Sequence, residues 1–420
     1  MTVFFMLLSG AAAQQAESRT DAGKPVRGFQ LSLLPYIGTD GSEAPHHTYR
    51  ISFNVLGGIT GGIDGLEAGG FASITRGNVK GIQVSGFGNL VSGNLNGFQG
   101  AGFINVTGGQ VQAFRGSGFL NITGGDFEGF TGAGFANITG GNGKGFSGAG
   151  FANITGGGYQ GFAGAGFANI TGGSANAFMG AGFANVTGGN FTGIQAAGFG
   201  NFTGGNVTGP QIAGFMNTAA DLKGLQVAGF LNIAGEVEGM QVGFINIADT
   251  ITGIPVGFLS IVRKGGLRQL EIAGSDVLHV GASFRIGVPH FYNIFSFGIR
   301  PFDKDGAGGF GYGIGTGIPV SGKLVLNLEA HSTQLRNDWS WKARKLDMLN
   351  EGRLLLSTRA GQSLQVFAGP VLYNQTYRDC TDCGYTPVDI APDRVFSTHN
   401  YAKHTSIWWI GARAGLRMDI

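Results

Sequence analysis

Apolar side chains recur at a fixed interval along the middle of the chain. The phenylalanines of a Gly-Phe-x-Asn-[Ile/Val]-Thr-Gly-Gly unit lie sixteen residues apart from Phe87 to Phe215, and the series continues at intervals of 15, 14 and 14 to Phe258. A second apolar residue, as at Phe98, follows most of these phenylalanines after eleven residues. Branched and aromatic residues between Gly-Gly pairs are typical of short strands joined by turns rather than of helices.

Charged residues in the repeat region are few and occupy one part of the unit. Nine lie between residues 97 and 260, and seven of them, including Asp126, Glu128 and Lys144, fall in the variable slot after Gly-Gly. Because burial of unpaired charge is costly, this slot is predicted to be a solvated turn. Arg115 is the clear exception to the pattern.

Two architectures satisfy this pattern. In a parallel β-solenoid each unit is one coil, and like residues of successive coils stack about 4.8 Å apart. Phenylalanine then forms an internal aromatic ladder and asparagine a hydrogen-bonded amide ladder, with glycine at the corners. In one continuous antiparallel membrane barrel, each unit is instead a single wall strand. The shortened copies around Phe230 and Phe244 favour the solenoid, because a one-residue deletion within a strand turns all later side chains to the other face.

The solenoid interpretation predicts which residues form the ladders. The aromatic ladder takes one phenylalanine from every unit, and the amide ladder takes one asparagine. The predicted ladder residues are Phe87, Asn89, Phe103, Asn105, Phe119, Asn121, Phe135, Asn137, Phe151, Asn153, Phe167, Asn169, Phe183 and Asn185.

The segments that flank the repeats alternate with a period of two residues. After the repeats they are 277–287, 291–300, 310–318, 323–331, 354–360, 364–373 and 407–420. In the last of them, Ile410 and Leu416 point one way and Arg413 and Arg417 the other, as in a membrane barrel with an apolar exterior and a polar lumen. Before the repeats, 29–37 and 49–56 are predicted to pair as a hairpin. Together the flanks offer eight or nine strands, enough for a small closed barrel, with a soluble β-sandwich as the alternative.

Composition excludes several classes of protein. Glycine accounts for 81 of the 420 residues, charged residues make up 12%, and the net charge is +2. A nearly neutral chain does not bind nucleic acid through bulk positive charge. With 34 phenylalanines the chain is too apolar for simple disorder, and its glycines lack the Gly-X-Y period of collagen.

We predict four parts in the chain: an export signal at 1–13, N-terminal strands at 14–64, the repeat region at 65–262 and a C-terminal antiparallel domain at 263–420. The apolar start of the chain leads to Ala11 and Ala13, which fit an A-x-A cleavage site, although no basic residue comes before Arg19. A buried N-terminal helix is the alternative. In an exported protein, Cys380 and Cys383 are interpreted as a disulfide that closes a loop, although a C-x-x-C pair can also be a redox motif or half a zinc site.

No motif for catalysis stands out. The seven histidines are scattered outside the repeat, no G-x-S-x-G elbow occurs, and the glycine-rich unit lacks the G-K-[ST] ending of a phosphate loop. We therefore predict no enzyme activity, no cofactor and no metal site. Asn-x-Thr recurs in the repeat and is formally a glycosylation signal, but its sixteen-residue spacing favours a ladder. A column of threonines could also face ice or a polysaccharide.

The Gly-Phe-x-Asn units resemble a family of surface-repeat proteins from Bacteroidetes and Leptospira. The segments 224–234 and 253–265, Phe-Tyr-Asn-Ile-Phe at 291–295 and Ile-Ala-Pro at 390–392 add to the resemblance. It implies an exported, envelope-associated protein with no assigned activity, and no functional residues carry over. We therefore expect a non-enzymatic cell-surface or outer-membrane repeat protein, structural or adhesive. Its expected partners are outer-membrane lipid and a surface glycan or protein, not nucleic acid, and the alternative function is an outer-membrane pore.

Overall fold

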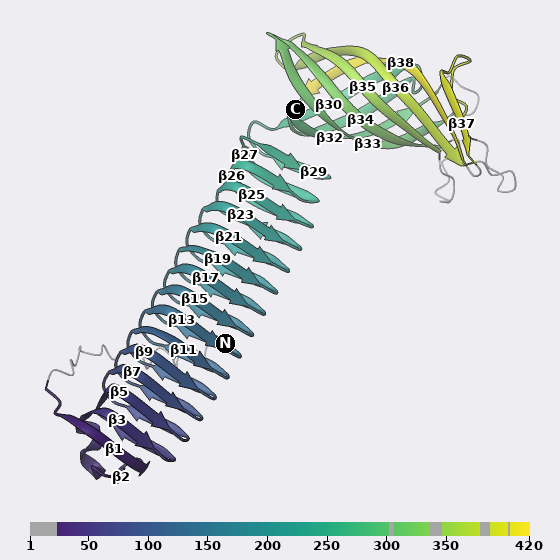
Figure 1. Ribbon diagram of the computed structural model, residues 1–420. Coiled ribbons are helices and arrows are strands. Elements are labelled where there is room, and N and C mark those ends of the chain that lie inside the picture. The colour runs from purple at the N-terminus through teal and green to yellow at the C-terminus, as the bar shows by residue number, and fades with distance from the viewer. Residues whose placement is uncertain (1–22, 302–305, 337–346, 379–386, 402–403) are drawn as a thin grey trace. The chain divides into compact units, whose positions relative to one another are not determined.

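The computed structural model describes residues 23–301, 306–336, 347–378, 387–401 and 404–420. The predicted export signal and the two cysteines, Cys380 and Cys383, lie outside these ranges. The protein is all-β, with a parallel β-solenoid of about 13 turns and a closed eight-stranded antiparallel barrel, so the predicted fold class is confirmed. The chain divides after Phe230 into two units, and the described strands of the first unit belong to the solenoid (Figure 1).

Each sixteen-residue repeat forms one coil with a short strand and a longer one. In the coil that begins at Phe103 these are β10 (Ile104–Thr107) and β11 (Val111–Ser117). Both pair in parallel with the same strands of the coils before and after, and the paired residues, such as Asn105 and Asn121, are sixteen positions apart. The alternative of one antiparallel strand per repeat is therefore wrong.

The remaining strands of the first unit repeat this arrangement. The short strands are β4 (Gly57–Thr60), β6 (Ala72–Thr75), β8 (Gly88–Val91), β12 (Leu120–Thr123), β14 (Ala136–Thr139), β16 (Ala152–Thr155), β18 (Ala168–Thr171), β20 (Ala184–Thr187), β22 (Gly200–Thr203) and β24 (Met216–Thr218). The long strands are β5 (Gly62–Gly69), β7 (Val79–Ser85), β9 (Leu95–Ala101), β13 (Phe127–Ala133), β15 (Gly143–Ala149), β17 (Tyr159–Ala165), β19 (Ala175–Ala181), β21 (Phe191–Ala197), β23 (Val207–Ala213) and β25 (Leu222–Ala228).

Two glycines of most coils are required by the stacking. The glycine before the corner phenylalanine has no room for a side chain, because a Cβ at Gly150 would lie 2.0 Å from the carbonyl oxygen of Gly134 in the preceding coil. Within the long strand, Gly145 has a φ of 114°, a conformation that L side chains rarely adopt. These two requirements, repeated in coil after coil, account for much of the glycine in the sequence.

The predicted N-terminal hairpin is wrong. β1 (Val26–Leu34) and β3 (Thr48–Asn54) lie side by side but run parallel, and β3 pairs in parallel with β5. The reason is the connection: a hairpin needs a short turn, whereas 35–47 contains β2 (Ile37–Gly38) and a 3-10 helix (Gly41–His46) that return the chain to the starting edge. These strands therefore begin the solenoid and contribute nothing to the barrel.

The second unit begins with further coils and ends with the barrel. The coil strands are β26 (Leu231–Val242), β27 (Ile245–Ile251), β28 (Ile254–Val256) and β29 (Leu259–Val262). The barrel strands are β30 (Leu267–Ser275), β31 (Val280–Val288), β32 (Phe291–Ile299), β33 (Gly308–Ser321), β34 (Leu324–Arg336), β35 (Asp347–Arg359), β36 (Leu364–Arg378) and β38 (His404–Asp419). Pairing of β30 with β38 closes the barrel, and β37 (Ser397–Tyr401) pairs with the first part of β38. All seven C-terminal segments predicted from the alternation are strands, whereas β30 was missed.

Candidate functional site

The corner phenylalanines form a continuous stack on the outside of the coils. Phe135 and Phe151 have ring centroids 4.9 Å apart and planes within 1° of parallel, and Phe151 and Phe167 are 4.8 Å apart. Each of these rings is nevertheless 40–42% exposed. The expectation of an internal aromatic ladder is thus wrong in its location. The physical reason is that asparagine and threonine already fill the interior of the short strand, while the phenylalanine lies in the bend before that strand, outside its alternation.

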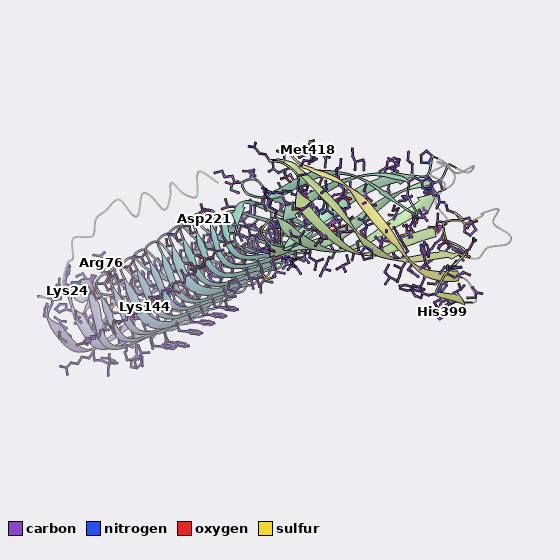
Figure 2. The ribbon with its side chains drawn as sticks, turned by 90° about the horizontal axis from the view of Figure 1, so that it is seen from above. Lys24, Arg76, Lys144, Asp221, His399 and Met418 are labelled. Carbon is purple, nitrogen blue, oxygen red and sulfur yellow. The ribbon has the colours of Figure 1, made fainter. Side chains whose placement is uncertain are left out.

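A second column of rings runs along the middle of the long strands. Phe130 and Phe146 stack at 4.6 Å and Phe146 and Phe162 at 5.0 Å. Most of these rings lie over the glycine two residues later, and a Cβ at Gly148 would lie 3.0 Å from Phe146 Cε1. We call the two columns and the glycine row between them the phenylalanine face. In Figure 2 a row of carbon-only side chains extends along one edge of the coils, opposite the edge where Arg76 and Asp221 are labelled.

The asparagines form the predicted amide ladder inside the coils. Asn137, Asn153 and Asn169 are at most 4% exposed. The side-chain amide of each donates to Oδ1 of the next asparagine, at 2.9 Å in both steps from Asn137 to Asn169. Its second N–H donates to a backbone carbonyl of its own coil, as from Asn153 to the Gly164 oxygen at 2.8 Å. Burial of the asparagines leaves their Asn-x-Thr triplets inaccessible in the folded coil.

The ladder contacts hold for every asparagine of the predicted set. From Asn89 to Asn185, each donates to the next at 2.8–3.0 Å. The phenylalanines of that set stack from Phe87 to Phe183 with centroid distances of 4.8–5.0 Å. The asparagines are therefore inside the coil and the phenylalanines outside it.

Two charged side chains are buried among these polar columns. Glu67 accepts hydrogen bonds from Gln83 at 2.7 Å, Asn54 at 3.0 Å and Thr75 at 3.1 Å. Burial raises the pKa of Glu67 in spite of these donors. Arg115, the exception to the charge pattern, is 1% exposed, and burial lowers its pKa to about 9.

The barrel has an apolar exterior. Its outward side chains are large aliphatic and aromatic residues, each 36–68% exposed: Leu270, Ile272, Val280, Phe310, Ile314, Ile318, Leu328, Leu354, Leu356, Leu364, Val366, Leu372, Ile410, Leu416 and Met418. The longest strands span 13–16 residues. A strand tilted at about 45° crosses a bilayer with about 9–11 residues.

The interior of the barrel is filled by a network of charged side chains. Glu329 accepts from Arg285 and Arg417 at 3.0 Å each, and Glu271 accepts from Arg417 at 2.8 Å and Arg413 at 2.9 Å. These five side chains are at most 5% exposed. Arg353 adds an ion pair with Glu351 and lies 3.4 Å from Glu329. An eight-stranded barrel has an interior just wide enough for side chains to fill, and here they bridge the lumen from strand to strand.

Segment 387–391 is held against the barrel strands by hydrogen bonds and apolar packing. The backbone N–H of Val388 donates to Asp347 Oδ2 at 2.8 Å, and the Val388 carbonyl accepts from Gln375 at 2.8 Å. Val388 and Ile390 pack in a buried apolar cluster with Tyr373 and with Trp409. The polar network and this apolar cluster are two separate layers of side chains within the same barrel.

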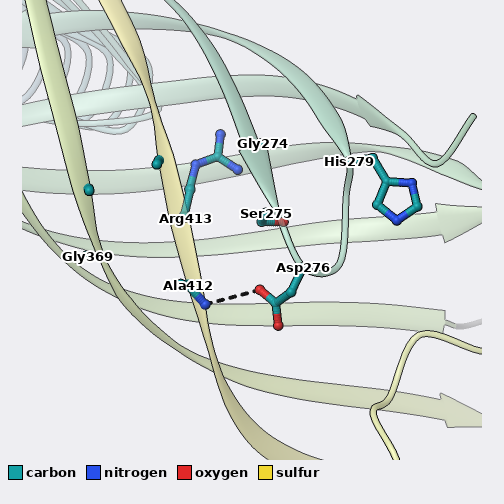
Figure 3. Close-up of a pocket in the computed structure, with 9 residues that line it drawn as sticks. Gly274, Ser275, Asp276, His279, Gly369, Ala412 and Arg413 are labelled. Atoms are coloured by element: carbon teal, nitrogen blue, oxygen red, sulfur yellow. Dashed lines mark hydrogen bonds between the residues drawn. The ribbon is translucent and has the colours of Figure 1, made fainter. Parts of the chain in front are cut away.

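Two of the cavities on the described part of the barrel have linings with several polar side chains. One, of about 640 Å³, has a lining that includes Arg268, Lys323, Arg359 and Asp419. The other, of about 580 Å³, is lined by Gly274, Ser275, Asp276, His279, Ala368, Gly369, Ala412, Arg413 and Ala414. Figure 3 shows Asp276 turned towards Ala412, whose N–H donates to Asp276 Oδ1 at 3.1 Å, and Tyr373 donates to the same oxygen at 3.2 Å. These bonds join the strands, which is a structural role.

The described residues contain no group of three His, Cys, Asp or Glu side chains that could hold a metal ion. None of the helical segments within the described ranges has the length and apolar character needed to cross a membrane. No protein-family model matches the chain, and neither does any curated protein or any solved structure.

Proposed function

We propose that this chain is a non-enzymatic outer-membrane repeat protein in which the barrel is the lipid anchor and the solenoid is the structural or adhesive part at the cell surface. The observation that carries the proposal is the polarity of the barrel. Large apolar side chains such as Leu354 face outward, while paired arginines and glutamates such as Arg417 and Glu329 face inward. This distribution is stable in lipid, where an apolar exterior needs no water.

A pore function has less support. The ion pairs of Glu329 and Glu271 connect β30, β31, β34 and β38 across the lumen, and the 387–391 segment packs against a second, apolar layer. Ion passage would require several buried pairs to separate, and each separation leaves an uncompensated buried charge. The resemblance of the repeats to surface-repeat proteins agrees with an anchoring role.

A charge placed on the outer wall tests the anchor directly. Leu354 lies in the middle of β35 and is 44% exposed, while Val320 lies near the end of β33 and is 56% exposed. In lipid, Leu354→Arg is expected to destabilise the barrel by about 2–4 kcal/mol and Val320→Arg by at most about 1 kcal/mol. The measurement is reversible denaturant unfolding of the full chain in phospholipid vesicles.

The soluble β-sandwich expected as an alternative is wrong, because β30 pairs with β38 and closes the sheet. A barrel that stays in water predicts a different result from a barrel in lipid. Both positions would then face water, and surface substitutions are usually within about 0.5 kcal/mol of neutral. Equal, small effects of Leu354→Arg and Val320→Arg, together with loss of the chain from vesicles in alkaline carbonate, would contradict the proposal. Steady single-channel currents from the purified wild-type chain in planar bilayers would favour the pore instead.

A further inference from the structure

The phenylalanine face is larger than an ordinary surface patch. Sixteen of its side chains are 37–54% exposed: Phe71, Phe87, Phe103, Phe119, Phe135, Phe151, Phe167, Phe183, Phe215 and Phe230 in the corner column, and Ile82, Phe98, Phe114, Phe162, Phe178 and Ile194 in the second. At ~80 Å² of exposed surface for each, they present ~1,300 Å² of apolar area. The largest apolar patch of a typical monomer is about 300–600 Å². One partner in a specific protein interface buries about 800 Å².

The stacking limits what this face can contact. Neighbouring rings in the corner column lie 4.7–5.1 Å apart and within 14° of parallel. The flat surface of each ring is therefore covered by its neighbours, and the edges face outward. A sugar or a nucleobase that stacks on an aromatic residue needs a free ring surface. The exposed edges instead suit dry packing against other apolar side chains.

Two apolar partners remain for this face, a membrane surface and another protein, and the charged residues distinguish between them. From Phe87 to Phe215 the exposed charged residues are two acids and one base: Asp126 in the turn, and Glu128 and Lys144 on the long strands, each two residues before a ring of the second column. A helix or sheet that lies on an anionic lipid surface typically carries lysine and arginine beside its apolar side. No basic border of this kind accompanies the phenylalanine columns, which favours a protein partner over the membrane surface.

The phenylalanine face has a regular period that a second copy of the same face would match. Both ring columns repeat once per coil, at the spacing of the strands. The small residues between the columns are mostly covered by rings of their own coil, since a Cβ at Gly148 would lie 3.0 Å from Phe146 Cε1, whereas one at Gly116 would meet nothing within 4 Å. Two such faces can therefore meet ring edge to ring edge in register, as side chains pack in a dry interface between paired sheets.

We infer that the solenoid pairs with the solenoid of a second copy of this chain through the phenylalanine face. The inference adds a partner to the proposed surface role, but it depends on coils of the first unit alone and not on membrane insertion of the barrel. A face of ~1,300 Å² is enough for a specific dimer interface.

Cross-linking in vesicles tests the pairing. In a full chain with C380S and C383S, one cysteine is introduced at Ile170, which lies beside the phenylalanine columns and is 39% exposed, or at Ser174, which is exposed in the turn before β19. With a short bismaleimide, Ile170→Cys is expected to give a covalent dimer at least five times more abundant than Ser174→Cys. This yield should persist when the vesicles contain tenfold more lipid.

Aspartate substitutions on the phenylalanine face, with matched substitutions elsewhere on the coil, test the same interface. Phe135→Asp with Phe167→Asp is expected to reduce the Ile170→Cys dimer at least fivefold, whereas Asn142→Asp with Asn190→Asp, in the exposed turns where another coil has Asp126, should leave it unchanged. If the aspartate pair prevents folding, Phe135→Tyr with Phe167→Tyr keeps the stacked rings and adds hydroxyl groups, and it should reduce the dimer as well.

Three results would overturn the inference: equal cross-linking at positions 170 and 174, a dimer yield that falls in proportion to lipid dilution, or a monomer whose spin label at position 170 collides with oxygen as it does in lipid. The last result would identify the membrane as the occupant. Carbonate extraction of the same vesicles tests the anchor separately. An extractable chain that still cross-links contradicts the anchor alone, and a retained chain that does not cross-link contradicts the pairing alone.

Discussion

Removing one asparagine from the buried ladder is expected to weaken the solenoid far more than removing one from its surface. In Asn153→Ala, the Asn137 side-chain N–H loses its acceptor, while Asn169 Oδ1 and the Gly164 carbonyl each lose a donor. Asn153 is 4% exposed, so solvent does not replace these partners without local opening. Leaving a buried polar group unsatisfied costs about 1–3 kcal/mol, and with some relaxation we expect about 4 kcal/mol for the three groups.

Hydrogen exchange of the full chain, resolved by mass spectrometry of peptides, measures this loss coil by coil. It suits a repeat array because each coil contacts only its neighbours and opening can be local. A loss of about 4 kcal/mol corresponds to about 1,000-fold faster exchange of the amides in the coils around position 153.

Asn176→Ala is the matched control. Asn176 lies on the exposed side of β19, so its removal is expected to change the opening free energy by less than about 0.5 kcal/mol. Similar exchange rates in the two variants would refute the reasoning, because they would mean that the buried amide ladder contributes no more than a surface side chain.

The remaining predictions concern glycine and the two buried charges. Gly150→Ala, whose Cβ would lie 2.0 Å from a carbonyl oxygen, should prevent regular stacking and speed exchange in its coil, while Gly116→Ala, with nothing within 4 Å, should not. Burial raises the pKa of Glu67, so as the pH rises the unfolded chain loses this proton before the folded chain does. The free energy of unfolding of wild type should therefore fall relative to that of Glu67→Gln as the pH rises from 4, by up to about 1.4 kcal/mol per pH unit. Equal pH dependence of the two free energies in denaturant melts would contradict this. Arg115→Gln should stabilise the coils by about 1–3 kcal/mol at pH 7, since a polar side chain like Gln99 in the preceding coil replaces a buried charge. Because burial lowers the pKa of Arg115 to about 9, the folded wild-type chain loses this proton above that pH while the unfolded chain keeps it, and wild type gains stability. The stability advantage of Arg115→Gln over wild type should therefore narrow above that pH, and an advantage independent of pH would contradict the prediction.

The spacing of the repeat was enough to predict the coil and the amide ladder. A sixteen-residue period with Asn-[Ile/Val]-Thr in every unit places like residues side by side, and Asn137, Asn153 and Asn169 are indeed linked by their amides. The two shortened copies favoured the solenoid over one continuous strand per unit, because a corner between two short strands absorbs the loss of a residue more easily.

The location of the phenylalanines was predicted wrongly because apolar residues are usually inside. The sequence does contain the signal for the observed arrangement. Glu128 comes two residues before Phe130, and Lys144 comes two residues before Phe146, in each case on one strand. Residues two apart in a strand share a face, so the solvated charges indicate that these rings lie outside too.

The barrel was predicted from alternation alone, but its closure and interior were not. The segment 267–275 alternates Leu270 and Ile272 with Gln269 and Glu271, yet it follows the last coil so closely that it was not recognised as a strand. Its pairing with β38 joins positions about 150 residues apart, and the ion pair of Arg417 with Glu271 depends on that closure. Register across such a separation is a tertiary property, which a local pattern does not contain.

The most direct test of the anchor is the environment of single side chains in the full chain reconstituted into phospholipid vesicles. Nitroxide labels at Leu356 and Leu372, which face outward, and at Val320, near a strand end, are compared for collision with oxygen and with a water-soluble nickel chelate. The account predicts that labels at 356 and 372 collide with oxygen and are shielded from nickel, while the label at 320 is reached by nickel. Strong nickel collision at all three positions would contradict it.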